Sequence, residues 1–202
     1  MKTIEIKENE EKELYQYDLN NFDLTYNLND YAKLVVYQYA SDIDGRIIVN
    51  LNGKNASVLY HFSTINYESH KIKIEINHNS SETISNIYNH AINASDNKFV
   101  FDITGKVLKT SDKCIVNQEN QIINLSAGEG AILPNLLIDN YDVVSSHAAY
   151  IGKFKDELLY YLMSRGIKKN VATRMLTKSL LVNGGDIENE KVKEFLEKIN
   201  NL

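Results

Sequence analysis

The chain has 202 residues, 43% of them hydrophobic, and a formal net charge of −5. This length suits one domain, with or without an appendage, and a substantial core. The acidic balance argues against a nucleic-acid partner, because no basic stripe is present to neutralise phosphates. Cys114 is the only cysteine, which excludes an intramolecular disulfide and favours the cytoplasm.

The N-terminal segment, residues 1–20, is strongly charged. Its run "KENEEKE", residues 7–13, is typical of a solvated segment. This end lacks the apolar stretch of a secretory signal, and no later window reaches the length of a membrane span. We therefore expect a soluble cytoplasmic protein whose partners are proteins or small molecules, with no nucleic acid and no membrane.

Residues 21–150 are expected to form a β-rich core. In "KIKIEIN", Ile72, Ile74 and Ile76 alternate with polar residues, which is the period of a strand with one buried face. Similar runs are separated by clusters of Asn, Asp, Ser and Gly that favour turns. These runs are residues 33–39, 46–51, 56–62, 98–103, 106–111, 113–118 and 121–126. Many short strands joined by short turns indicate a mainly β fold.

Three β architectures fit this pattern: a sandwich, a closed barrel, and a solenoid whose strands stack turn upon turn. Asn is abundant in the turns and beside the apolar positions, and Pro134 is the only proline. Both features favour stacked turns with bent corners. The runs are spaced irregularly and define no strict repeat length, so the periodicity alone leaves the three architectures open.

Residues 151–202 change to the period of helices and are expected to form a C-terminal helical region. Three apolar stripes consist of Phe154, Leu158, Tyr161 and Leu162, of Ala172, Met175, Leu176 and Leu180, and of Val192, Phe195, Leu196 and Ile199. Gly166 lies where the first helix needs a left-handed cap, and Asp186 is the expected N-cap of the third. Helices this short need a surface to cover their stripes, which is another helix, the β core or another protein.

A distinctive motif joins the two parts. The stretch "DVVSSHAAYIGKFKDELLYYLMSRGI", residues 142–167, closely resembles the C-terminal signature of the SufB/SufD family of iron-sulfur cluster assembly proteins. The matching positions are Asp142, Val143, Ser146, His147, Ala149, Gly152, Asp156, Tyr161, Leu162, Ser164, Arg165, Gly166 and Ile167. Weaker similarity extends upstream through "NLSAGEGAILPNLLI" and "INHNSSETISN".

The resemblance implies a right-handed parallel β-helix with a C-terminal helical region. Members of the family pair through the C-terminal ends of their β-helices, and each docks an ABC-type ATPase, SufC, on its terminal helices. This implies a non-catalytic subunit that dimerises with a SufB-type paralogue or with itself and is linked indirectly to a cysteine desulfurase system. A transient iron-sulfur cluster would assemble at the interface of the dimer.

His147 is the residue that the motif marks as a candidate ligand of the nascent cluster and its iron, since imidazole replaces thiolate in Rieske centres. On physical grounds alone, a lone histidine in a turn is more often a hydrogen-bonding residue. The resemblance also places a set of residues at partner interfaces. They are Asp142, Ser145, Ser146, Leu158, Tyr161, Leu162 and Arg165.

The sequence departs from the family pattern in several places. Typical members are much longer, with an N-terminal helical region and more turns. Ser145 stands where relatives often carry a cysteine, and Ala148 replaces a glycine. A partner would therefore have to supply thiolates. Two readings stay open, a scaffold that shares its cluster site and a purely structural subunit that has lost the cluster role.

The remaining candidate residues have simpler interpretations. Cys114 is expected to be a small buried hydrophobe rather than a ligand. The other histidines, His61, His70, His78 and His90, lack metal-ligand spacing and are expected at the surface or at corners. For His78 we expect a stacking or hydrogen-bonding role. Three tyrosines are expected to pack in the core or at an interface: Tyr60, Tyr160 and Tyr161.

Other chemistries have little support. The sequence contains no phosphate-binding loop, nucleophile elbow or His-Glu-x-x-His pair, so ATP hydrolysis would come from a partner. A β-helix can also carry a carbohydrate-active site, which needs two carboxyl groups within several ångströms of each other. The candidates for such a pair are Asp102, Glu119 and Glu129.

Overall fold

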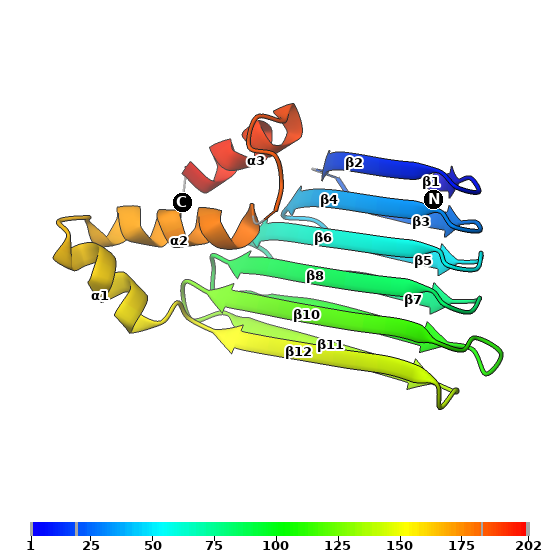
Figure 1. Cartoon of the computed structure of the whole chain (residues 1–202). Helices are drawn as coiled ribbons and strands as arrows, with labels where there is room; N and C mark the ends of the chain where they lie inside the picture. Colours follow the sequence, from blue (N-terminus) through cyan, green and yellow to red (C-terminus); the bar gives the residue numbers. More distant parts are fainter. Residues whose placement is uncertain (1, 19, 183, 201–202) are drawn as a thin grey trace.

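The computed structural model describes residues 2–18, 20–182 and 184–200. Its strands form two six-stranded parallel sheets (Figure 1). The first sheet has the order β1 (Lys2–Ile6), β3 (Phe22–Leu28), β5 (Gly45–Leu51), β7 (His70–His78), β9 (Lys98–Val107) and β11 (Glu129–Ile138). From its first strand, the second has the order β2 (Glu11–Asp18), β4 (Lys33–Ser41), β6 (Ser57–Asn66), β8 (Ile84–Asn93), β10 (Cys114–Asn124) and β12 (Val143–Gly152). The chain alternates between the sheets, so each pair of strands adds one turn to a parallel β-solenoid.

The core lies between the two sheets. Each strand pairs in parallel with the strand two positions along the chain, so equivalent residues stack in columns; Val36, Tyr60 and Ile87 form one such column. All three are buried, because every second side chain of a strand points into the solenoid. The alternation seen in the sequence is therefore the alternation between the core and the outer faces.

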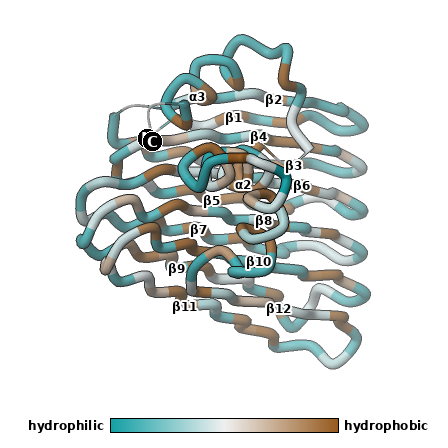
Figure 2. The backbone as a smooth tube through the Cα atoms, turned by 90° about the vertical axis from the view of Figure 1, so that its left-hand side faces the viewer, coloured by the Kyte–Doolittle hydropathy of each residue, from teal (hydrophilic) through white to brown (hydrophobic). Residues whose placement is uncertain are grey.

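The strands are joined at corners where hydrophilic residues gather, as Figure 2 shows. Amide ladders link neighbouring turns: Nδ2 of Asn77 donates to Oδ1 of Asn50 over 2.9 Å, and Nδ2 of Asn50 donates to Oδ1 of Asn27 over 2.8 Å. Identical side chains meet in this way only when turns stack in register. The abundance of Asn thus reflects the solenoid, as the sequence suggested.

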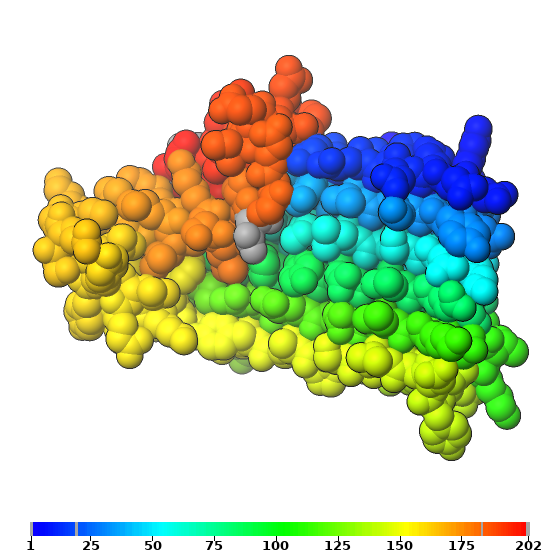
Figure 3. All heavy atoms as spheres, viewed as in Figure 1, coloured from blue at the N-terminus to red at the C-terminus, as the bar shows by residue number. Residues whose placement is uncertain are grey.

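Three helices follow the solenoid: α1 (Asp156–Ser164), α2 (Lys169–Leu181) and α3 (Glu190–Asn200). α3 packs against β2 and β4, and α2 packs against β8, so these helices cover part of the outer face of the second sheet. Phe195 and Leu181 are buried there against Ile65 and Ile92. In contrast, α1 buries none of its side chains and extends with the start of α2 beyond the ends of the strands (Figure 3).

The ends of the helices follow sequence cues with one exception. Gly166 follows α1 with a φ of 83°, as expected of a left-handed cap. The expectation for Asp186 is wrong, because the N-cap of α3 is Asn189, whose Oδ1 accepts from the backbone N–H of Lys191 over 2.9 Å. Within the described ranges, no helix has the length and apolar character needed to cross a membrane.

The structure confirms the mainly β fold, a parallel β-helix followed by a helical region. Two strand boundaries were wrong: residues 106–111 are no separate strand, since β9 ends at Val107, and the runs 113–118 and 121–126 belong to the single strand β10. β1 and β2 fall within residues 1–20 and pair with β3 and β4. The first turn of the solenoid therefore includes these charged residues.

Candidate functional site: the open end of the solenoid

The last strand, β12, is an exposed edge. It pairs with β10 along ten residues, and its opposite edge has no strand partner in the part of the chain that the structure describes. No described helix covers this end of the stack (Figure 1). Eight of its ten residues are exposed, so β12 presents a long row of backbone N–H and C=O groups to whatever lies beyond it.

The two edges of the second sheet differ in charge. β12, with the sequence "VVSSHAAYIG", contains no Asp, Glu, Lys or Arg, whereas β2 at the other edge begins with Glu11, Lys12 and Glu13. Charged side chains protect an edge strand from pairing with other chains, while a long uncharged edge favours such pairing. The open end therefore has the character of an interface.

His147 lies on the inner face of β12. It pairs in register with Gln118 of β10, which pairs with Ile87 of β8, and this column is the inward one. Ser145, two residues earlier, projects from the same face. At the open end this inner face is exposed, so both side chains point toward the solenoid axis and can be reached from beyond the last turn.

Ser146 lies on the opposite, outer face of β12. Its Oγ donates to Oδ1 of Asn117 over 2.8 Å, and Nδ2 of Asn117 donates to Oδ1 of Asn86 over 3.0 Å. Asp142 precedes the strand, where its carbonyl oxygen accepts from the backbone N–H of Lys113 over 2.6 Å. The structure thus brings together four residues of the motif, but it separates Ser146 from His147 by the thickness of the strand.

Sequence reasoning missed the buried amides beneath His147. Nδ2 of Asn89 donates to Oδ1 of Asn120 over 2.7 Å, and Nδ2 of Asn120 donates to the carbonyl oxygen of Ala148 over 3.4 Å. Gln118 is buried directly beneath His147 in the same column. The signal was present in "NQENQ", where polar residues take the inward positions of a strand, and these amides make the last turns more polar inside than the apolar middle.

The predicted helical interface residues lie mostly on the exposed surface of α1. Leu158 and Tyr161 are 47% and 56% exposed, and the guanidinium of Arg165 lies 4.5 Å from the centre of the Tyr161 ring. Leu162 is half-buried. The apolar stripe of α1 is therefore largely uncovered, whereas α3 buries Val192, Phe195 and Ile199. Of the tyrosines singled out, Tyr60 is in the core and Tyr160 is exposed.

Cys114 and His78 form a buried hydrogen-bonding cluster. Cys114 is fully buried, as expected, with Sγ 3.2 Å from Oγ1 of Thr83. His78 lies 2.7 Å from Oγ1 of Thr83 through Nδ1 and 2.9 Å from Oγ of Ser85 through Nε2. The expected hydrogen-bonding role of His78 is confirmed, and it lies at the end of β7 before a turn, but it is buried and not at the surface.

His90 is also buried, so its surface assignment is wrong as well. Burial lowers the pKa of both His78 and His90 to about 4. His61 stacks between Tyr37 and Tyr88, with ring centres 5.0 Å and 4.9 Å away, and its pKa is lowered by burial. These three histidines have structural roles.

The three carboxylates weighed for a carbohydrate-active site are not brought together. Asp102 points outward from the first sheet and pairs with Nζ of Lys71 over 2.7 Å, whereas Glu119 points outward from the second sheet. Glu129 lies 3.8 Å from Nζ of Lys98 at an exposed position. Two carboxylates on opposite outer faces cannot act on one glycosidic bond.

Within the ranges that the structure describes, no three His, Cys, Asp or Glu side chains are grouped as a metal site. His147 is thus a single imidazole at an open edge. An iron-sulfur cluster has several iron atoms and needs ligands for each. The described residues group no further His, Cys, Asp or Glu side chains around His147 as a metal site.

The fold and the open end at β12 define a parallel β-solenoid protein with an exposed terminal strand and an attached helical region. A family model described as SUF system FeS cluster assembly, SufBD core domain, matches residues 21–180. The chain belongs to this family, the SufB/SufD family. It is similar to the iron-sulfur cluster assembly protein SufD of Bacillus subtilis (strain 168), with 37% identity over 91 residues, 45% of this chain and 21% of that relative. The match thus spans about a fifth of the length of the relative.

Proposed function

We propose that the chain is a non-catalytic scaffold subunit of SUF-type iron-sulfur cluster assembly. In this proposal β12 pairs with a SufB-type paralogue or a second copy, and the helical region docks an ABC-type ATPase. The cluster is transient cargo rather than a resident cofactor. The observation that carries the proposal is the uncharged, exposed strand β12 with His147 on its inner face.

Strand addition explains why this edge suits a protein partner. A partner strand laid against β12 would satisfy its free backbone groups and extend the sheet. Val144 and Ile151, which are 67% and 44% exposed, would be covered at the same time. Burial of such apolar side chains adds to the free energy of association.

His147 is the ligand that the chain offers to a shared cluster. Its inward position at the open end would place the imidazole between the two solenoids of a dimer, away from the outer surface. A thiolate from the partner would complete the ligand set, since Ser145 occupies the neighbouring inward position on this chain. Imidazole is a suitable ligand for iron.

The first test is anaerobic co-purification of the tagged protein from its native cells, with mass spectrometry of the partners and assays of iron and sulfide. We expect an ABC-type ATPase, a longer paralogue and iron. His147→Ala should lose most of the iron and keep both partners. Ser146→Ala is the matched control, because Ser146 lies on the same strand but on its outer face, and it should keep the iron.

Two outcomes would contradict parts of the proposal. Recovery of both partners with no iron in the wild-type protein would leave a purely structural subunit of the complex. Recovery of neither partner would show that the family resemblance reports ancestry and that the chain works outside such a complex.

A further inference from the structure

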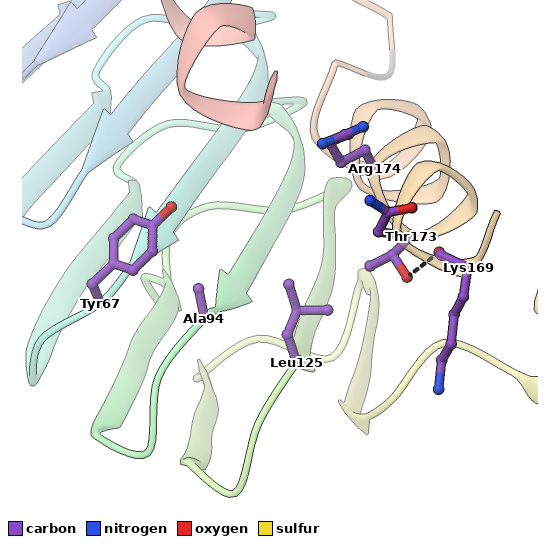
Figure 4. A pocket seen from close by; sticks show the side chains of 7 residues that line it. Tyr67, Ala94, Leu125, Lys169, Thr173 and Arg174 are labelled. Carbon is purple, nitrogen blue, oxygen red and sulfur yellow. Dashed lines mark hydrogen bonds between the residues drawn. The ribbon is translucent and has the colours of Figure 1, made fainter. Parts of the chain in front are cut away.

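A pocket of about 560 Å³ lies between α2 and the corners that follow three strands of the second sheet (Figure 4). One side is formed by the first half of α2 and the other by the residues that come directly after β6, β8 and β10. It is lined by Tyr67, Ala94, Leu125, Lys169, Asn170, Thr173 and Arg174. No residue of this pocket belongs to the open end described above.

The corner side of the pocket is an apolar strip. Asn66, Asn93 and Asn124 pair in register on β6, β8 and β10, so the residues that follow them take equivalent places on successive turns. These residues are Tyr67, Ala94 and Leu125. Neighbouring strands lie about 4.8 Å apart, so the strip is roughly 10 Å long, enough for one or two apolar side chains of a ligand.

The helix side of the pocket is cationic. Lys169 and Arg174 make no salt bridge with any residue for which the structure gives a position. Thr173 donates from Oγ1 to the carbonyl oxygen of Lys169 over 3.0 Å, a contact within the helix that leaves the ammonium free. Lys169 also lies in the first turn of α2, where the helix dipole adds positive potential.

The segment around the pocket is also positively charged. Residues 153–178 contain seven basic and two acidic side chains, a formal charge of +5 in a chain whose net charge is −5. In the third helical segment, Glu188 and Glu194 pair with lysines of that same segment. The exposed start of the helical region is therefore a basic surface on an acidic protein.

We propose that the ATPase partner presents an acidic segment with at least one apolar side chain, which seats in this pocket. The apolar side chain would lie on the strip of Tyr67, Ala94 and Leu125, and carboxylates on either side of it would pair with Lys169 and Arg174. This inference rests on the proposed function, since it assigns the chemistry by which the docked ATPase is recognised.

A protein segment fits better than a small anion. Sites for small molecules enclose most of the ligand and fix it with buried polar groups, whereas Lys169 and Asn170 are exposed. The basic surface also continues beyond this pocket to Lys153 and Lys155, which line a second pocket beside α1. A small anion would use only Lys169 and Arg174, whereas an acidic protein surface can also reach cations beyond the pocket.

The test measures binding of the purified SufC-type ATPase from the same genome to the full chain by isothermal titration calorimetry at low and moderate salt. The double variant Lys169→Glu, Arg174→Glu should weaken binding by about tenfold or more at low salt and reduce its salt dependence. Its matched control is Lys7→Glu, Lys109→Glu, two exposed lysines in turns at the end of the solenoid opposite the helices (Figure 1), which should bind like wild type.

Carbodiimide coupling of the complex gives a second readout, because it joins amines to carboxylates that already touch. We expect Lys169 to be linked to Asp or Glu of the ATPase. Wild-type binding with no effect of the double variant and no such link would overturn the inference and leave the proposed docking intact. If the wild-type chain does not bind the ATPase at all, the docking proposal and this inference both fail.

Discussion

His78 shows how one buried side chain depends on hydroxyl groups of its own turn of the solenoid. Oγ1 of Thr83 donates to the carbonyl oxygen of Ser80 over 3.0 Å, so it must accept the proton of His78 Nδ1. Nε2 of His78 then accepts from the hydroxyl of Ser85. The neutral ring satisfies both contacts, whereas a second ring proton would require the Ser85 hydroxyl to turn and accept, and would place a charge at a buried position.

The stability of the protein should therefore fall in mild acid. His78 and His90 have pKa values of about 4 in the folded protein, below the 6.5 or so of an unfolded histidine, so the unfolded chain binds protons first as the pH falls. Their contribution is complete above about pH 6.5 and is lost toward pH 4, by up to about 1.4 kcal/mol per pH unit for each histidine.

Urea unfolding at pH 7.5 and pH 5.5 checks this expectation. The midpoint should be lower at pH 5.5, and His78→Gln should reduce the difference between the two conditions. His70→Gln is the control, because His70 lies at a corner outside this network. Equal midpoints for the wild-type protein at the two pH values would show that these histidines do not resist protonation.

At the scale of elements, the first and third helices differ in how much they bury. α3 is held by Phe195, whose ring centre lies 4.9 Å from that of Tyr39 and 5.7 Å from that of Tyr17. α1 has no such anchor. We therefore regard α3 as part of the packed body and α1 as a surface element.

Phe195→Ala should lower the free energy of unfolding by about 3 to 5 kcal/mol, because it removes a fully buried ring and leaves a cavity. Leu158→Ala on α1 should change it by less than about 1 kcal/mol, since that side chain is half exposed. Chemical denaturation of both variants gives the comparison. A similar loss for the two would mean that α1 is packed as firmly as α3.

The sequence predicted which segments form strands and helices better than it predicted the residues at which they begin and end. Alternation located the strands of the middle turns because the inward positions there are apolar. It failed along β10, where Gln118 and Asn120 take inward positions and bond to amides of neighbouring turns. Partners 31 and 17 residues away cannot be read from a local pattern. The burial of His78 and His90 was missed because a polar residue was expected to face solvent.

At the candidate site, the motif located His147 and its neighbours, but the sequence could not say which side chains face inward. That follows from the register of β12 on β10, which places Ser145 and His147 on one face and Ser146 on the other. The helical motif likewise identified Leu158 and Tyr161 without showing that α1 leaves them uncovered. Exposure is a property of the assembled stack.

At the scale of the whole molecule, the uncharged edge predicts association. Val144→Lys with Ala148→Lys would place two cations on the outer face of β12 and should abolish pairing with the paralogue or a second copy, while the fold is kept. Analytical ultracentrifugation measures the pairing and circular dichroism the fold. Glu11→Lys with Glu13→Lys on β2 is the control and should pair like wild type. If the β12 variant still pairs and the β2 variant does not, the interface lies at the other end of the solenoid.

The contact between the two ends of the chain has a consequence for how the solenoid comes apart. The backbone N–H of Asp186 donates to the hydroxyl of Tyr15 over 3.2 Å, across 171 residues, and α3 lies on β2. In an ordinary repeat protein the terminal turn frays first, since it touches only one neighbour. Here the first turn cannot peel away without releasing α3, so we expect unfolding to begin at the open end, at β12, and not at the first turn.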